Sequence, residues 1–260
     1  MPESQFYTLR PMKTFRAGIL QDINDPVVIE TQMTIVVNGR EVVVLACSPA
    51  HLEELAVGYL VSEGLLCRGQ QIDSIQLAAN HTVLIEGNMV WESANDQTRV
   101  VNTCMGKGLA SPAFTHPADS PVLRSGSRFK AQDLLAAIEE LNTTSETFRL
   151  TGGVHSAGLG QGAALLVRYE DIGRHNAVDK VFGYAFLQDL SMEDKYLVLS
   201  GRIAGEILMK AARSGVSLIL SRSAPTLRTV ELAEELGITI VGFARGERFN
   251  VYTHWDRIQV

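Results

Sequence analysis

Three cysteines are the candidate nucleophiles of this sequence, and their settings differ. Cys104 lies in a glycine-rich segment, residues 103–108 (TCMGKG), where flexibility would expose the thiol and Lys107 would favour the reactive thiolate. Composition alone leaves an idle thiol on a flexible loop equally open. Cys47 ends an apolar run and is predicted to be a small core residue, and Cys67 is predicted to be structural at a helix end. Cys104 is therefore the candidate for sulfur chemistry.

Arginine recurs in the turns that follow predicted strands in the second half of the chain. Four such turns contain one beside Gly or Ser, and these are Arg174, Arg202, Arg222 and Arg245. In an open parallel sheet the carboxyl ends of the strands form the ligand crevice, where helix N-termini favour anions. A guanidinium group adds a planar fork that matches phosphate. A phosphate-bearing ligand is the preferred interpretation, and solvated loop arginines are the alternative.

His155 stands among glycines in residues 151–158 (TGGVHSAG), which predicts close backbone approach or positive φ angles. It could carry a proton near neutral pH, although a hydrogen-bonded structural histidine is the preferred interpretation. Asp171, His175 and Asp179 share a helical spacing that could suit a metal. We interpret Asp171 instead as a helix cap and Asp179 as a surface partner of Lys180, and no metal site is predicted.

Two nucleotide-binding motifs are absent from the sequence. There is no Gly-x4-Gly-Lys-Ser/Thr loop and no Gly-x-Gly-x-x-Gly after a strand. ATPase and ordinary dinucleotide-dehydrogenase activities therefore lose support.

The elements that must position these residues fall into two parts. In the first, residues 27–37 and 42–46 read as strands around the hairpin signal Asn38-Gly39, and a helix is predicted from Ser48-Pro49. Further strands are predicted at 72–78, 82–85 and 99–101. Residues 102–128 lack periodicity and are predicted to form a mobile, cysteine-bearing loop at the boundary between the two parts. The predicted N-terminal α+β subdomain, residues 1–127, ends in this loop.

The second part, residues 128–260, alternates between strands and helices. An amphipathic helix is predicted around residues 134–141, then strands at 163–169, 196–199, 217–220 and 238–243. Helices are predicted at 176–187, 204–213 and 227–236. This βαβαβ order predicts a parallel sheet flanked by helices and an α/β fold class, α+β for the chain overall.

Bulk properties exclude several classes of protein. The net charge is −6, which argues against a nucleic-acid-binding protein. Residues 151–260 carry 12 basic and 12 acidic residues, so the acidic excess lies wholly before them. No apolar run reaches the length of a membrane span, and no secretory signal is evident. Three cysteines do not suggest a disulfide framework, and a reducing cytoplasm fits best.

Five segments together resemble signatures of the FdhD family. They are residues 151–158 (TGGVHSAG), 170–180 (EDIGRHNAVDK), 200–202 (SGR), 221–226 (SRSAPT) and 241–253 (VGFARGERFNVYT). The resemblance covers essentially the whole chain and is densest from Thr151 onward. The eleven-residue block at 170–180 is the most specific of the five.

The resemblance implies a cytoplasmic sulfur carrier that prepares formate dehydrogenase. Such proteins take sulfur from a cysteine desulfurase as a cysteine persulfide and pass it to a molybdenum or tungsten bis-guanine-dinucleotide cofactor. A homodimer, a cytidine-deaminase-like three-layer domain with a smaller β-rich N-terminal subdomain, and the formate dehydrogenase apoenzyme as partner are implied. Guanine nucleotides could mimic the cofactor, and no zinc is expected.

The resemblance also assigns site residues. Cys104 matches the first cysteine of the family's Cys-x-x-Cys loop motif and would be catalytic. A cofactor-binding stretch corresponds to Phe243, Ala244, Arg245, Gly246, Glu247 and Arg248. With the strand-end arginines, we expect Ser223 and His155 to complete the cofactor-binding set.

One departure keeps two functions open. The second cysteine of the loop motif is Lys107 here, so a two-thiol relay within the loop is impossible. A single persulfide on Cys104 still works chemically and is preferred, and Lys107 would stabilise its anion. The alternative is a non-catalytic chaperone that only binds the molybdopterin guanine dinucleotide cofactor.

Two further activities fit less well. A zinc deaminase needs a Glu two residues after its ligand and a Pro-Cys-x-x-Cys motif, and Ser156-Ala157 follow His155 instead. A thiol hydrolase would need Cys104 and His155 to meet, which sequence alone cannot place.

Overall fold

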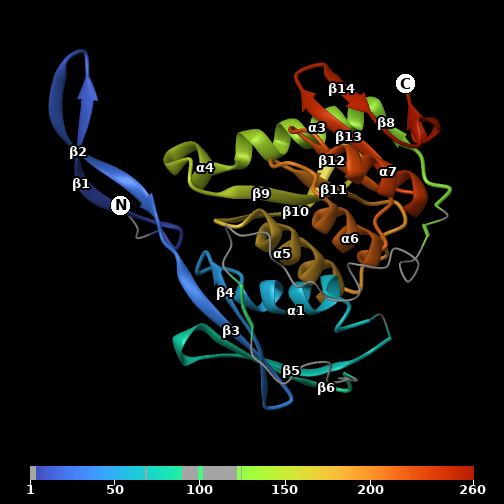
Figure 1. Cartoon of the computed structure of the whole chain (residues 1–260), viewed down its shortest axis with the longest axis horizontal. Coiled ribbons are helices and arrows are strands. Elements are labelled where there is room, and N and C mark those ends of the chain that lie inside the picture. Colours follow the sequence, from blue (N-terminus) through green and yellow to red (C-terminus); the bar gives the residue numbers. More distant parts are fainter. Residues whose placement is uncertain (1–3, 68, 90–98, 102–121, 124) are drawn as a thin grey trace.

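The fold is that of a computed structural model, which describes residues 4–67, 69–89, 99–101, 122–123 and 125–260. Two sheets with helices between them make up most of the molecule (Figure 1). The mixed α/β class predicted from the sequence is confirmed. The proposed boundary between residues 127 and 128 stays a prediction, and Cys104 and Lys107 lie outside the described residues.

A six-stranded sheet forms the larger layer. Its order is β10-β9-β11-β12-β13-β14, and the strands span β9 (His155–Gln161), β10 (Ala164–Asp171), β11 (Tyr196–Leu199), β12 (Leu218–Ser221), β13 (Thr239–Arg245) and β14 (Arg248–Val251). β11, β12 and β13 are parallel, as the alternation predicted. β9 is antiparallel to both β10 and β11, so the sheet is mixed and the predicted parallel arrangement holds for its central strands.

Helices cover both faces of this sheet. α3 (Ala131–Thr144) packs on one face through Leu134, Ile138 and Leu141. α5 (Arg174–Leu187), α6 (Gly205–Ser214) and α7 (Leu227–Leu236) lie on the other. Alternate residues of β11 and β12 pack into the apolar cores on the two faces of the sheet, because neighbouring side chains of a strand point to opposite faces. The short α4 (Glu146–Thr151) and the pair β8 (Phe129–Lys130) and β15 (Ile258–Gln259) flank this unit.

The smaller sheet has the order β5-β6-β3-β4-β7. Its strands span β3 (Thr31–Val37), β4 (Arg40–Cys47), β5 (Ile72–Ala78), β6 (Thr82–Gly87) and β7 (Arg99–Val101). The hairpin predicted at Asn38-Gly39 is confirmed, since both residues have positive φ and Val37 pairs with Arg40. The apolar face of the smaller sheet packs on α1 (Leu52–Ser62). The helix begins later than the start predicted at Ser48-Pro49.

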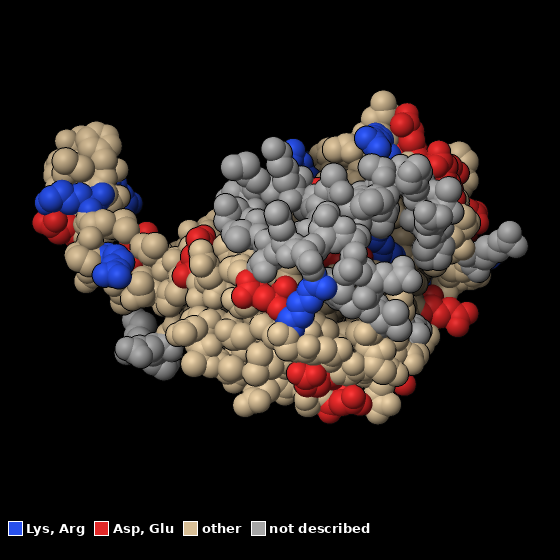
Figure 2. Space-filling model, turned by 60° about the horizontal axis from the view of Figure 1, so that its bottom comes forward, with Lys and Arg blue, Asp and Glu red and all other residues tan. Residues whose placement is uncertain are grey.

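An arm of two strands, β1 (Tyr7–Arg16) and β2 (Ile19–Val28), projects from the body (Figure 1). The predicted strand at 27–37 is therefore two strands, because β2 ends at Val28 and β3 begins at Thr31. The arm carries exposed apolar side chains such as Phe15 and Leu20, and the ion pair Lys13–Asp22 at 2.7 Å. Figure 2 shows both charge signs on this arm.

α1 meets α5 at an unusually close crossing. A Cβ on Gly58 would lie 1.7 Å from the carbonyl oxygen of Asp179, and one on Gly183 would lie 1.8 Å from that of Glu54. No side chain fits at such distances, so glycine at both positions lets the two helix backbones touch. This contact joins the smaller sheet and α1 to the helices of the larger sheet.

Asp171 anchors one end of that crossing. Its carboxylate accepts bonds from Lys180 Nζ at 2.7 Å, Ser48 N at 3.1 Å, and Gly173 N and Asn176 Nδ2, both at 2.9 Å. Asn176 Nδ2 also donates to the carbonyl oxygen of Ala46. Asp171 and Lys180 are both fully buried. Asp171 therefore holds the turn before α5, but it is not the helix cap predicted from the sequence, because the N-cap residue is Gly173. Ser48 serves this cluster rather than beginning α1.

Asp179 anchors the other end and corrects an expectation. It is 1% exposed and pairs with Lys210 at 2.8 Å, not with Lys180 at the surface. Ser62 Oγ donates to Asp179 at 2.6 Å, and Glu63 accepts from Lys210 at 3.1 Å. α1, α5 and α6 are thus joined by buried charges that satisfy one another.

Candidate functional site

The turns predicted to bear arginine all lie at one edge of the six-stranded sheet. β10 and β11 run in the same direction because each is antiparallel to β9, and β11, β12 and β13 are parallel. The carboxyl ends of these four strands therefore share an edge, which is called here the strand-end crevice because open sheets bind ligands at this position. Arg174, Arg202, Arg222 and Arg245 lie at or just after these strand ends. β9 begins at the same edge, with His155 paired to Asp171.

Short contacts bind these turns into one surface. Ser221 Oγ donates to the carbonyl oxygen of Gly201 at 2.7 Å and accepts from Ser223 N at 3.0 Å. Phe243 N donates to the carbonyl oxygen of Ser223 at 3.1 Å. A Cβ on Gly201 would lie 3.4 Å from His155 Nδ1 and 3.8 Å from the Arg174 side chain. The structure thus brings together Arg174, Gly201, Ser223, Phe243 and His155.

Arg174 is the first residue of α5 and the most enclosed of the crevice arginines. Its side chain is half-buried, and its Nε is buried without a hydrogen-bond partner in the part of the chain that the structure describes. The N-terminus of a helix adds a partial positive charge at this position. An enclosed guanidinium with a free donor is suited to an anionic ligand.

The remaining arginines of the predicted set are exposed. Arg202, Arg222, Arg245 and Arg248 all lie at the surface of this edge, and Arg245 pairs with Arg248 across the turn between β13 and β14. Glu247 in that turn is also exposed. Exposed arginines on neighbouring turns create a positive electrostatic potential that attracts phosphate.

The backbone is strained just before the turn between β13 and β14. Phe243 has φ 54°, a left-handed conformation that is uncommon for an aromatic residue, and the β13–β14 register shifts between Gly242 and Arg245. A Cβ on Gly242 would lie 3.0 Å from the Ser223 carbonyl oxygen, so glycine admits the neighbouring turn. Phe243 is 38% exposed, whereas Ala244 is buried in the sheet. The strain places an aromatic ring at the crevice and assigns Ala244 a packing role.

His155 is half-buried beside two cationic positions. Burial lowers its pKa, and the charge of Arg174 lowers it further, so the fold favours the neutral imidazole. A neutral imidazole beside an arginine can accept a proton when an anion binds.

His175 and Glu206 form a pair behind this edge that sequence reasoning missed. Their Nε2 and Oε2 atoms lie 2.9 Å apart, and the contact with His175 lowers the pKa of Glu206. Glu206 lies in the first turn of α6, 31 positions after His175, so no sequence spacing pointed to the pair. This contact occupies the Glu206 carboxylate, whose pKa the charge of Arg174 also lowers. Among the described residues, no cluster of side chains is suited to a metal ion.

The cysteines are placed as follows. Cys47 is fully buried at the end of β4, which confirms its predicted core position, and burial raises its pKa to about 12. Cys67 is exposed after α1 rather than packed as a structural residue. The position of Cys104 relative to the crevice stays a prediction, because the residue lies outside the described ranges.

Charged groups are sparse on the part of the face in Figure 2 that the structure describes. Among the described residues on that face, acidic groups are scattered over a mostly uncharged surface, and no continuous basic area is visible. No described helix is both long and apolar enough to cross a membrane.

Comparisons with known proteins agree with this architecture. The model of the FdhD/NarQ family matches residues 28–259. A protein of Listeria monocytogenes serotype 4b (strain F2365), named sulfur carrier protein FdhD, is 41% identical over 253 residues, which cover 95% of this chain and 97% of that protein. The protein of that name from Geobacillus kaustophilus (strain HTA426) is 39% identical over 254 residues, 96% of each chain.

A solved structure shares the fold. It is described as the crystal structure of a putative formate dehydrogenase accessory protein from Desulfotalea psychrophila, with a TM-score of 0.82 and 26% sequence identity. The alignment covers 98% of this chain and 100% of that one. With the family model matching nearly the whole sequence, this chain belongs to the FdhD/NarQ family.

Proposed function

We propose that this chain is a sulfur carrier for formate dehydrogenase maturation, with Cys104 as the sulfur-bearing residue. The names of its relatives supply the activity, and the strand-end crevice supplies a place for the recipient. The cargo would be the molybdenum bis-guanine-dinucleotide cofactor, bound as a substrate. The observation that carries this proposal is the half-buried Arg174, whose Nε lacks a partner among the described residues.

Each part of the crevice suits a part of that cargo. Arg174 and the exposed Arg202 and Arg222 would neutralise phosphates, as guanidinium groups do in other phosphate sites. The exposed ring of Phe243 could stack on a guanine base. Neutral His155 would accept a proton as the negative charge of the ligand arrives. These residues would bind and orient the cargo and balance its negative charge.

The sulfur chemistry needs one thiol. The Cys104 thiolate attacks the outer sulfur of a persulfide on a cysteine desulfurase, a new S–S bond forms, and the desulfurase thiolate leaves. Delivery of that sulfur to the cargo as a sulfide ligand breaks the Cys104 S–S bond and consumes two electrons, which a thiol reductant supplies. Because Lys107 replaces the second cysteine, we propose a relay with a single persulfide.

Sulfur loading is tested by mass spectrometry of the intact protein. After incubation with a cysteine desulfurase and cysteine, we expect a gain of about 32 Da that maps to Cys104. Cys104→Ala should lose the gain, whereas Cys47→Ala, at a fully buried thiol, should keep it. An unmodified Cys104 in the native chain would reject the persulfide.

A second candidate is a chaperone that binds the cofactor without sulfur transfer. The strand-end crevice favours this chaperone function, because every feature described there would act in binding the cofactor. A Cys104→Ala variant that fully restores formate dehydrogenase activity in cells lacking the native protein would support the chaperone. Loss of activity with unchanged binding of guanosine diphosphate (GDP) would support the carrier.

The setting of this activity is part of the proposal. The formate dehydrogenase apoenzyme and a cysteine desulfurase would be the partners, and the chain would act in the cytoplasm as a homodimer. The odd number of cysteines suits a reducing compartment. Sedimentation of the purified protein tests the dimer.

A further inference from the structure

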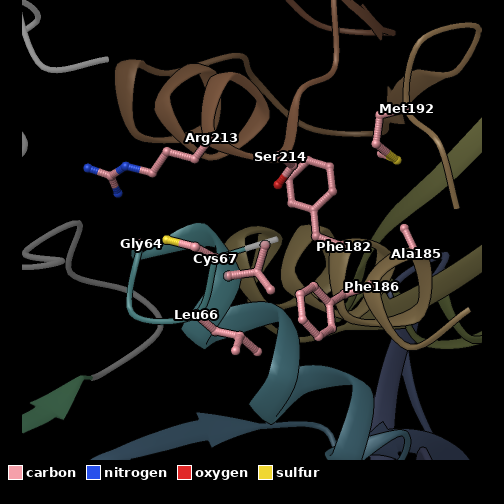
Figure 3. Close-up of a pocket in the computed structure, with 10 residues that line it drawn as sticks. Gly64, Leu66, Cys67, Phe182, Ala185, Phe186, Met192, Arg213 and Ser214 are labelled. Atoms are coloured by element: carbon pink, nitrogen blue, oxygen red, sulfur yellow. The ribbon is translucent and has the colours of Figure 1, made fainter. Parts of the chain in front are cut away.

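A cavity of about 320 Å³ opens at the ends of α1, α5 and α6 (Figure 3). Apolar side chains from these helices and their connections form most of its wall, and they include Val61, Leu66, Phe182, Phe186 and Met192. Its volume lies at the lower end of the range for small-molecule sites. We call it the Cys67 cavity, because Cys67 lines it with an exposed thiol.

This cavity is separate from the strand-end crevice. α5 and α6 begin at the crevice, with Arg174 and Gly205, and residues near their other ends line the cavity. A ten-residue helix such as α6 is about 15 Å long. A ligand of the crevice and a ligand of the cavity would therefore occupy opposite ends of the same helices.

Ser214 marks a binding position in the cavity wall. The residue is 9% exposed, and its Oγ is buried without a hydrogen-bond partner among the described residues. Figure 3 shows this oxygen directed from the end of α6 toward the cavity. A buried hydroxyl without a partner is costly, and a ligand atom that bonds to it would recover the loss.

The other polar groups indicate an uncharged ligand. Arg213 Nη1 donates to the carbonyl oxygen of Ser62 at 2.8 Å, and Figure 3 shows the guanidinium directed away from the cavity. Cys67 N donates to Gln70 Oε1 at 2.7 Å, which fixes the turn that presents the thiol. No described acidic side chain lines the cavity. The wall thus offers apolar surface, one hydroxyl and one thiol.

We propose that the Cys67 cavity binds a small uncharged molecule with an apolar ring and one hydroxyl group. The ring lies against Val61 and Phe186, and the hydroxyl bonds to Ser214 Oγ. The bound molecule covers the Cys67 thiol. Because α1 and the pair α5 and α6 contribute different walls, the ligand binds only the folded chain and stabilises it.

The test uses benzyl alcohol and toluene on the full-length protein. Both molecules have the same ring, and only benzyl alcohol can bond to Ser214. Alkylation by iodoacetamide is followed at each cysteine by peptide mass spectrometry. We expect benzyl alcohol to slow alkylation of Cys67 at least fivefold, and toluene to need about a fivefold higher concentration for the same protection.

Two variants decide the assignment. Ser214→Ala should abolish the preference for benzyl alcohol over toluene. Val61→Trp fills the cavity and should remove protection by both, whereas Leu77→Trp, at an exposed position on β5, should leave protection intact. If Val61→Trp does not fold, the preference measured in Ser214→Ala still decides.

Three outcomes of the protection assay would overturn the proposal. They are an alkylation rate of Cys67 that benzyl alcohol does not change, equal protection by the two probes, and an unchanged preference in Ser214→Ala. A Cys67 as unreactive as the buried Cys47 would also reject it, because the cavity would then be closed in the native chain. Sulfur loading of Cys104 is measured independently, so failure here leaves the proposed function untouched.

Discussion

The strand-end crevice and the crossing of α1 with α5 and α6 use cationic side chains in opposite ways. At the crossing, Lys180 and Lys210 are buried and meet carboxylates at 2.7 and 2.8 Å. At the crevice, Arg202, Arg222 and Arg245 are exposed, and Arg174 keeps a buried Nε without a partner in the described chain. Satisfied cations hold the architecture, whereas unsatisfied ones are available to a ligand. Changes at the crossing should therefore lower stability, and changes at the crevice should lower binding.

The largest effect is expected from Asp179→Ala. It leaves the buried Lys210 ammonium with Glu63 as its remaining carboxylate, and breaking a buried pair in this way costs about 3–5 kcal/mol of unfolding free energy. Urea unfolding followed by circular dichroism measures the loss. The matched change Asp194→Ala, which removes an exposed carboxylate that pairs with Lys195, should cost under about 1 kcal/mol. Equal losses in the two variants would mean that the buried pair does not hold the crossing.

A somewhat smaller loss is expected from Gly58→Ala. The added Cβ would lie 1.7 Å from the Asp179 carbonyl oxygen, so α1 and α5 must separate, at a cost of at least about 1–3 kcal/mol. Gly205→Ala is the control, because no atom lies within 4 Å of a Cβ there. Thermal unfolding should show a lower Tm for Gly58→Ala alone. A Tm unchanged by both substitutions would contradict the close crossing.

At the crevice, Arg174→Gln should weaken GDP binding and leave stability almost unchanged. The loss of charged hydrogen bonds to phosphate corresponds to about a tenfold to hundredfold increase in Kd. Calorimetric titration measures the affinity, and urea unfolding checks the fold. Arg149→Gln, at an exposed arginine on α4, should bind GDP like the native chain. Equal affinity in both variants would remove Arg174 from the proposed site.

Local pattern in the sequence predicted much of the larger sheet. The runs that became β11, β12 and β13 are short, apolar and separated by amphipathic helices, and that order favours parallel strands whose carboxyl ends meet. The order of strands and helices alone was therefore enough to place Arg202, Arg222 and Arg245 at one edge. Arg174 joins them because β9 lies between β10 and β11. Their exposure and the free Nε of Arg174 could not be predicted in this way, because both depend on how distant turns pack.

Elements without an ordinary strand pattern were missed. β9 reads as a glycine-rich loop, yet Gly160 is needed because a Cβ there would lie 2.3 Å from the Tyr196 ring. The arm of β1 and β2 mixes polar and apolar residues on both faces, since it packs on no core along most of its length. Pairs such as Asp179 with Lys210, 31 positions apart, are set by tertiary packing and leave no local signal.

The smallest effect is expected from the pH dependence of the crevice. Burial and the charge of Arg174 lower the pKa of His155, so the unliganded protein resists its protonation and loses some stability as the pH falls below about 6.5. A bound anion opposes this by favouring the imidazolium, so its binding should take up protons. GDP affinity should therefore rise a few-fold more between pH 7.5 and 6 in the native chain than in His155→Gln. Calorimetric titrations in buffers of different ionisation enthalpy measure the proton uptake, and identical uptake in both proteins would place His155 outside the field of the ligand.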